Sequence, residues 1–220
     1  MADTSPTQVL DYVFLGSRQH AKNREMLESL GITHILNVTP TRKVDPVAGV
    51  PNFFEKDNVF AYRRCALFDN QGEDILTSLD GCIAFIDQAK FHGRIFVHCK
   101  AGVSRSASIV LAYLMKANAM PFDEALSFLQ HKRPMVRASY RLISAPHFRT
   151  QLQAFEKRLV RQSATGRRGT APSGPSSAAA SIGPQLPPHL KRPAASDNVQ
   201  NDRVDATSMS PKWKKAKVDE

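Results

Sequence analysis

Apolar side chains recur along the chain with two periods, one typical of β-strands and one typical of helices. Four short runs rich in β-branched and aromatic residues, each bounded by glycine, proline or polar residues, lie at residues 12–16, 32–38, 61–68 and 94–98. The run at 94–98 is nearly all apolar or β-branched between its ends. It is therefore expected to be a strand buried on both faces of a sheet.

Helical spacing of apolar residues alternates with these strands and then follows them. It predicts helices over residues 21–30, 74–90, 104–117, 121–131 and 146–161. Pro121 suits the first turn of its helix, where its missing N–H would have no intrahelical partner. Strands that alternate with helices, followed by a run of helices, indicate an α/β sheet that is covered on both faces.

The composition changes near residue 160, where Ser, Ala, Pro, Gly, Lys and Arg replace the apolar residues. We expect one folded domain over residues 1–161 and a disordered basic tail over residues 162–220, because such a tail cannot bury enough surface to offset its ordering entropy. Residues 211–218 resemble a short basic nuclear-localisation segment that a nuclear import receptor would bind; a solvated basic end is the alternative.

Charge and cysteine content narrow the classes of partner. The formal net charge is +10, but the basic residues are scattered without aromatic interleaving, which disfavours nucleic acid as a partner. Neither an apolar run of membrane-spanning length nor a signal peptide is seen, so we expect no membrane association and a location in the cytoplasm, the nucleus or both. Cys65, Cys82 and Cys99 show neither metal-type spacing nor a disulfide framework, so no metal site is predicted.

The segment after the buried strand has the residues of an anion site. Between that strand and the next predicted helix, backbone N–H groups would converge on one point, as at other helix N-termini that bind phosphate. Gly102 lets the backbone curl, and Arg105 can offer a planar pair of donors to two phosphate oxygens. The predicted phosphate-binding residues are Lys100, Ala101, Gly102, Val103, Ser104 and Arg105.

Cys99 is the predicted nucleophile at this site. A free cysteine is only about 3% thiolate at neutral pH, but a helix N-terminus and a nearby guanidinium lower its pKa. The thiolate could attack a bound phosphate in line, forming a phosphocysteine that water hydrolyses. Ser106 would donate its hydroxyl proton to the departing sulfur, whereas His98 is expected to support the loop without a chemical step.

Protonation of the leaving oxygen calls for a carboxylic acid on a loop that reaches the pocket. Asp69, in a turn-forming loop 30 residues before Cys99, is the first candidate for this general acid and base. Asp74 lies in the same segment and is the second candidate, although it is also placed to cap the following helix.

His98-Cys99-Lys100-Ala101-Gly102-Val103-Ser104-Arg105-Ser106 resembles the His-Cys-x5-Arg-Ser signature of dual-specificity protein phosphatases, and the resemblance extends over about residues 9–159. It implies the protein-tyrosine-phosphatase fold, a three-layer α/β/α architecture, and a mechanism without metal or other cofactor. It also implies phosphotyrosine and phosphoserine or phosphothreonine in proteins as substrates, with kinases among the candidates. Residues 137–145 depart from the family pattern and look like an insertion before the last helix.

Two other functions remain open at this point. One is a catalytically idle phosphoprotein-binding module, which the presence of Cys99, Arg105 and Ser106 disfavours. The other is the same chemistry on RNA 5′-triphosphates or phosphoinositides, which the absence of a second cation at Val103 and Ser104 disfavours. With no room for a kinase-docking domain before residue 10, we expect a small atypical member of the family that acts as a monomer.

Overall fold

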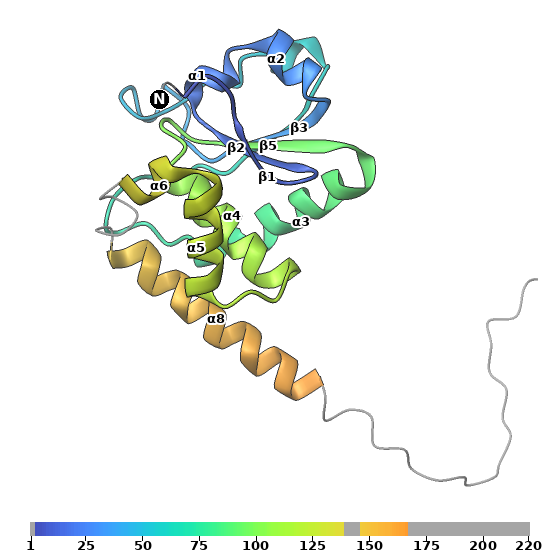
Figure 1. Ribbon diagram of the computed structural model, residues 1–220. Helices are drawn as coiled ribbons and strands as arrows, with labels where there is room; N and C mark the ends of the chain where they lie inside the picture. Colours follow the sequence, from blue (N-terminus) through green and yellow to red (C-terminus); the bar gives the residue numbers. More distant parts are fainter. Residues whose placement is uncertain (1–2, 139–145, 167–220) are drawn as a thin grey trace, which may run out of the picture. The chain divides into compact units, whose positions relative to one another are not determined.

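The computed structural model describes residues 3–138 and 146–166, all within one compact unit, Met1–Pro172 (Figure 1). Its centre is a five-stranded sheet with the strand order β1-β2-β5-β3-β4. β1 runs antiparallel to β2, and the pairs β2–β5, β5–β3 and β3–β4 are parallel. The strands are β1 Thr7–Leu10, β2 Val13–Gly16, β3 Ile32–Asn37, β4 Ala61–Arg64 and β5 Arg94–His98.

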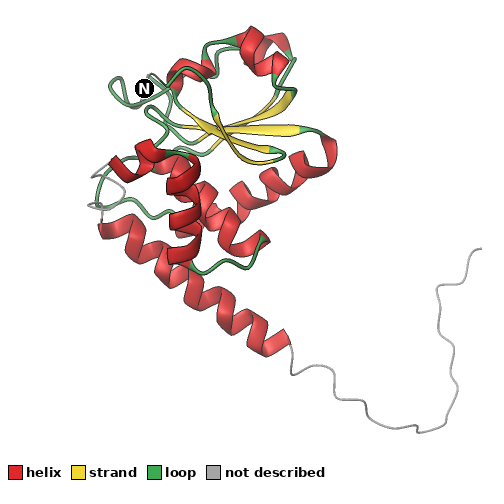
Figure 2. Cartoon of the chain, viewed as in Figure 1, coloured by secondary structure: helices red, strands yellow, loops and turns green. Residues whose placement is uncertain are grey.

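Helices cover both faces of this sheet (Figure 2). One face carries α1, Arg18–Ala21, and α2, Arg24–Ser29. The other face carries four long helices and the short α6, and a 3-10 turn, η1, precedes β4. These elements are α3 Leu76–His92, α4 Arg105–Ala117, α5 Phe122–Lys132, α6 Pro134–Ala138, α8 Pro146–Gly166 and η1 Glu55–Asp57. The predicted α/β sheet between helical layers is thus confirmed.

Two apolar clusters pack against the two faces because successive side chains of a strand point to opposite sides. Phe14, Ile35 and Phe96 join Leu27 of α2 in the smaller cluster. The neighbouring positions of the same strands join α3, α4, α5 and α8 in the larger cluster. In β5, Ile95, Phe96 and Val97 are all fully buried, as predicted for a strand covered on both faces.

The structure corrects several predicted boundaries. The helix expected over residues 21–30 is two short helices, because the side chain of Asn23 accepts a hydrogen bond from Met26 N at 3.0 Å and starts α2. β1 was not predicted, and the strand expected over 61–68 ends at Arg64. The last helix continues to Gly166, five residues past its expected end at residue 161.

Two other expectations concern residues that lie outside the described ones. These are residues 139–145, most of the departure from the family pattern, and residues 167–220, which include the basic segment at 211–218. Among the described residues, no helix combines the length and the apolar character that a membrane span requires.

Candidate active site

The site forms where β5 gives way to α4. β5 lies between β2 and β3 and is parallel to both, so its carboxyl end opens at the middle of the sheet edge. Ligands of α/β proteins bind outside the carboxyl ends of such strands. Residues 99–104 form the turn, and α4 begins at Arg105, one residue later than predicted.

Three carbonyl groups of the turn are held by partners on its outer side. Cys99 O accepts a hydrogen bond from His98 Nδ1 at 3.4 Å, and Lys100 O accepts one from Arg18 N at 3.1 Å. Gly102 O accepts one from Arg133 Nε at 3.0 Å. In a planar trans peptide the next N–H points the opposite way. The N–H groups that follow these carbonyls are thereby turned toward the inside of the loop.

Gly102 has a backbone conformation and a packing environment that exclude a side chain. Its φ is +73°, in the left-handed region that glycine tolerates. A Cβ atom there would lie 2.5 Å from Gly16 O and 3.0 Å from Arg133 Nη2. The loop therefore requires glycine at this position.

The Cys99 thiol lies at the base of the loop and is only 2% exposed. Its Sγ atom accepts hydrogen bonds from Gly102 N and Ser106 Oγ, both at 3.1 Å. Burial by itself raises the pKa of the thiol, but the charge of Arg105 and the hydrogen bonds from Ser106 and Gly102 outweigh it. The net result is a pKa of Cys99 below its ordinary value.

Arg105 has one buried donor, Nε, that an anion could bind. Its Nη1 donates to Leu67 O at 3.2 Å. Its Nε is buried without a hydrogen-bond partner among the described residues, 4.0 Å from Asp69 Oδ2. A buried N–H of this kind calls for an acceptor, and a phosphate oxygen in the pocket can supply one.

Asp69, rather than Asp74, lies at the pocket. Its Oδ1 accepts a hydrogen bond from Ser104 Oγ at 2.8 Å, and its side chain is 20% exposed. Asp74 is exposed at the start of α3, where its Oδ1 accepts from Leu76 N at 2.9 Å. The geometry therefore brings the first candidate acid, and not the second, next to the turn.

The pocket has a volume of about 520 Å³ and three walls. One is the turn itself, and the second is the Asp69 loop with Phe68 and Asn70. The third, which sequence reasoning missed, is the loop before β4 with Asp45, Val47 and Ala48. Arg64 holds the base of that loop through hydrogen bonds from Nη1 to three carbonyls, Thr39 O, Pro40 O and Val50 O.

His98 is buried beneath the loop, stacked on the Phe96 ring with the ring centroids 5.2 Å apart. Burial is the main reason that the pKa of His98 falls to about 3, and the charges of Arg64 and His20 lower it further. The hydrogen bond to Cys99 O has the opposite effect but is smaller. A neutral imidazole can hold the Cys99 carbonyl, which fits a supporting role.

Cys65 and Cys82 are not among the residues that line this pocket. Their side chains interact with each other, which lowers the pKa of Cys65 and raises that of Cys82. Both belong to or pack against the larger apolar cluster. Among the described residues, no group of three or more His, Cys, Asp and Glu side chains could hold a metal ion.

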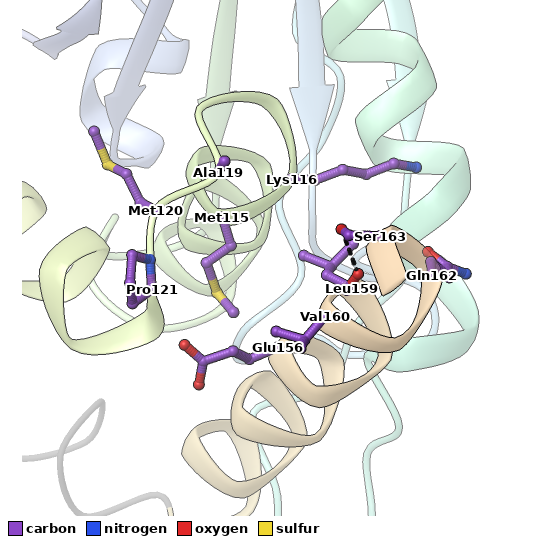
Figure 3. Close-up of a pocket in the computed structure, with 10 residues that line it drawn as sticks. All are labelled: Met115, Lys116, Ala119, Met120, Pro121, Glu156, Leu159, Val160, Gln162 and Ser163. Atoms are coloured by element: carbon purple, nitrogen blue, oxygen red, sulfur yellow. Dashed lines mark hydrogen bonds between the residues drawn. The ribbon is translucent and has the colours of Figure 1, made fainter. Parts of the chain in front are cut away.

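A second pocket, of about 250 Å³, lies between the end of α4 and α8 (Figure 3). Met115, Met120 and Leu159 give it apolar walls, and Glu156, at its edge, accepts a hydrogen bond from Phe122 N at 2.9 Å. Its lining residues contain no cysteine, histidine or arginine. This pocket therefore lacks the pair of cysteine and arginine that lines the first pocket.

Sequence reasoning also missed Gly16, Arg18 and Arg133 as parts of the site. Each touches the turn from another part of the chain, through the Gly102 contact, Lys100 O and Gly102 O, respectively. No local pattern marks these residues, because their contacts depend on how β2, α1 and the end of α5 pack beside the turn.

Known proteins are similar to this chain in both sequence and fold. The family model described as dual specificity phosphatase, catalytic domain, matches residues 13–158. Dual specificity protein phosphatase 1-B of Xenopus laevis is 37% identical over 166 residues, which are 75% of this chain and 41% of that protein. Human protein phosphatase Slingshot homolog 2 is 39% identical over 153 residues, which are 69% of this chain and 10% of that protein. The chain thus spans less than half the length of these curated relatives.

Solved structures agree with this relationship. Human DUSP28 superposes with a TM-score of 0.57 at 29% identity, over 71% of this chain and 99% of that one. The human tyrosine phosphatase-like serine/threonine/tyrosine-interacting protein gives a TM-score of 0.58 at 27% identity, over 71% of this chain and 98% of that one. The range that the family model matches includes the whole turn and all three walls of the pocket. The chain therefore belongs to the dual-specificity protein phosphatase family.

Proposed function

We propose that this chain is a protein phosphatase that hydrolyses phosphotyrosine and phosphoserine or phosphothreonine through a phosphocysteine on Cys99. The observation that carries the proposal is the environment of the Cys99 thiol. It accepts two hydrogen bonds, and its pKa is lowered despite burial, at the base of a pocket that Arg105 also lines. An activated thiolate facing an anion site is the arrangement that nucleophilic attack on phosphorus requires.

In the first step, the inward N–H groups of the turn and the guanidinium of Arg105 bind the phosphate oxygens. The Cys99 sulfur attacks phosphorus in line, an S–P bond forms, and the bond from phosphorus to the substrate oxygen breaks. The carboxyl of Asp69 gives its proton to the leaving oxygen. The 2.8 Å hydrogen bond from Ser104 Oγ supports this role because it keeps the carboxyl at the pocket.

In the second step, water attacks the phosphorus of phosphocysteine. Asp69, now ionised, accepts a proton from the water as the P–O bond forms and the S–P bond breaks. The hydrogen bond from Ser106 Oγ stabilises the thiolate that leaves. Phosphate then departs, and the starting protonation states return.

The charge of the pocket favours a single phosphate on a protein side chain over an RNA triphosphate end or a multiply phosphorylated lipid. Its lining residues include two cations, Lys100 and Arg105, and two carboxylates, Asp45 and Asp69. A triphosphate end or a multiply phosphorylated lipid would place several further negative charges beside those carboxylates, which is unfavourable. A single phosphate on a side chain needs only the turn and Arg105, and phosphorylated kinases are among the candidate substrates.

The idle binding module is the second candidate. One structural neighbour is named phosphatase-like, so the fold alone does not carry the proposal. A binding module would need the anion pocket but would not need a hydroxyl directed at the sulfur. The contact between Ser106 and Cys99 therefore favours an enzyme.

Further parts of the proposal concern the rest of the chain. We assign the residues through the end of α8 at Gly166 to the catalytic domain, in place of the expected boundary at 161, and residues 167–220 to a tail. The basic segment of this tail at 211–218 would bind a nuclear import receptor. The enzyme would act as a monomer in the cytoplasm, the nucleus or both. Imaging of fluorescent fusions of the full chain, with and without Lys212→Ala, Lys214→Ala and Lys215→Ala, together with sedimentation of the purified protein, tests these assignments.

Single-turnover hydrolysis of an aryl phosphate, with chelator present throughout, tests the central proposal. Cys99→Ser should abolish turnover, and Asp69→Asn should slow it by about 10²- to 10⁴-fold. Asp74→Asn is the matched control from the same segment and should leave the rate near that of the wild type. A folded, inactive wild type that binds phosphopeptides would establish the binding module instead. Hydrolysis of triphosphate RNA or phosphoinositides without hydrolysis of phosphopeptides would show that the substrates are not phosphoproteins.

A further inference from the structure

A buried arginine lies behind the phosphate-binding turn. Arg133 follows α5 and is 2% exposed, one of the largest fully buried side chains of the described residues. Its Nε donates to Gly102 O at 3.0 Å. It does not line the pocket, so it acts on the turn from outside.

The other donors of this guanidinium bind the N-terminal segment. Nη1 donates to Asp3 Oδ1 at 2.9 Å and to Thr7 Oγ1 at 3.1 Å, and Nη2 donates to Asp3 Oδ2 at 2.7 Å. The pair of Arg133 and Asp3 is thus bidentate, the geometry in which a guanidinium and a carboxylate bind most strongly. Residues 130 positions apart are joined behind the site.

Asp3 is itself fixed to the part of the chain that touches Gly102. Its carbonyl oxygen accepts a hydrogen bond from His20 Nε2 at 2.9 Å, and Ser17 N donates to His20 Nδ1 at 3.1 Å. Ser17 follows Gly16, whose carbonyl lies against Gly102. At Gly102 the turn is therefore held both by Gly16 and by a guanidinium that Asp3 orients.

Burial makes Arg133 dependent on Asp3. A buried cation that loses its carboxylate is strongly destabilised, so the guanidinium would reorient toward water. Gly102 O would then lose its donor, and the peptide between Gly102 and Val103 would be free to rotate. The Val103 N–H, which that peptide aims into the pocket, would no longer be fixed.

We propose that Asp3 and Arg133 are a positioning pair for the phosphate-binding turn. Asp3 orients the guanidinium, Arg133 holds the Gly102 carbonyl outward, and the Val103 N–H is thereby directed at the phosphate. The inference rests on the proposed function, in which the turn binds the phosphate of the substrate. It makes residues at the beginning of the chain a determinant of substrate binding.

The test compares Asp3→Asn with Asp3→Glu and with Asp11→Asn. Asp11 is exposed between β1 and β2, so its variant makes the same charge change away from the turn. The inhibition constant of tungstate, a tetrahedral oxyanion, is measured with kcat and KM for an aryl phosphate. The temperature is one at which circular dichroism shows each variant folded, and Tm is recorded separately. Asp3→Asn should raise the inhibition constant of tungstate and lower kcat/KM, each by about tenfold, because a preorganised donor is lost.

Asp3→Glu keeps a carboxylate and should recover most of the loss, and Asp11→Asn should match the wild type. Arg133→Lys keeps the charge but cannot bond both Gly102 O and the two oxygens of Asp3, so it should resemble Asp3→Asn. Should Arg133→Lys fail to fold, the Asp3 variants decide, because the Asp3 side chain is 21% exposed.

A lower Tm in Asp3→Asn with unchanged tungstate inhibition and unchanged kcat/KM would show a purely structural role and overturn the inference. Failure of the proposed function would look different. The wild type would then show no hydrolysis that depends on Cys99, while tungstate binding, followed by calorimetry, would still weaken in Asp3→Asn.

Discussion

The hydroxyl of Ser106, in the first turn of α4, donates a hydrogen bond of 3.1 Å to the Sγ atom of Cys99. Both residues are buried, Cys99 at the base of the pocket and Ser106 behind it in α4. Such a bond is stronger to the thiolate than to the thiol, because a charged acceptor strengthens a hydrogen bond. The contact therefore stabilises Cys99 both as a nucleophile and as a leaving group.

Ser106→Ala should raise the pKa of Cys99 and slow hydrolysis of the phosphocysteine by about ten- to a hundredfold, since hydrogen bonds to charged groups contribute roughly 1.5–3 kcal/mol. Rapid-quench kinetics with an aryl phosphate should show a burst of phenol release followed by slow turnover. Ser108→Ala, which removes a hydroxyl that bonds to Ser104 O in the same helix, is the control. Equal slowing in both variants would point to α4 as a whole rather than to the sulfur contact.

Arg105→Lys should separate the two effects of the guanidinium. The positive charge is kept, so the pKa of Cys99 should remain below its ordinary value, as read from the pH dependence of inactivation by iodoacetate. The planar pair of donors is lost, so kcat/KM for an aryl phosphate should fall about 10²- to 10³-fold. Arg63→Lys, at an exposed position of β4, makes the same change away from the pocket. Wild-type kcat/KM in Arg105→Lys would exclude bidentate phosphate binding.

Gly102→Ala should both destabilise the domain and abolish tungstate binding, because its Cβ would lie 2.5 Å from Gly16 O and its φ is +73°. Gly31→Ala isolates the backbone effect. Gly31 has a φ of +67°, but its Cβ would meet only Arg94 Cδ at 3.8 Å. Gly31→Ala should therefore lower the free energy of unfolding by about 1–2 kcal/mol, with kcat/KM unchanged. Tungstate binding by Gly102→Ala would contradict the requirement for glycine at this position of the turn.

His98 should make the domain less stable in acid. The pKa of His98 is about 3 in the folded protein, against about 6.5 when unfolded. Below pH 6.5 the unfolded chain therefore binds the extra proton, and stability falls as pH decreases toward 3. This one group should contribute about 1.4 kcal/mol per pH unit over that window.

Urea unfolding at pH 7, 6 and 5 measures this slope. His98→Asn should make the free energy of unfolding less dependent on pH, and Asn can still donate to Cys99 O. His131→Asn, at an exposed position of α5, should keep the wild-type slope. An identical slope in wild type and His98→Asn would contradict a neutral, buried His98.

The sequence by itself determined the part of the site that is contiguous along the chain. The continuous apolar run from Ile95 to Val97 indicates a strand in the interior of a sheet. Gly102 and Arg105 follow this strand within the next seven residues. The strand, turn and helix could therefore be predicted to within one residue, together with the residues that surround Cys99. Their catalytic roles remain predictions.

Other features were decided only by the tertiary structure. Asp69 and Asp74 are both plausible acids in the sequence, and the packing of their loop against the turn brings Asp69 to Ser104 while Asp74 bonds to the start of α3. The contacts of Arg133 with Asp3 and Gly102 join distant segments, and no local spacing encodes them. Periodicity reports which face of an element is buried, whereas the partner across that face depends on how the sheet and its helices assemble.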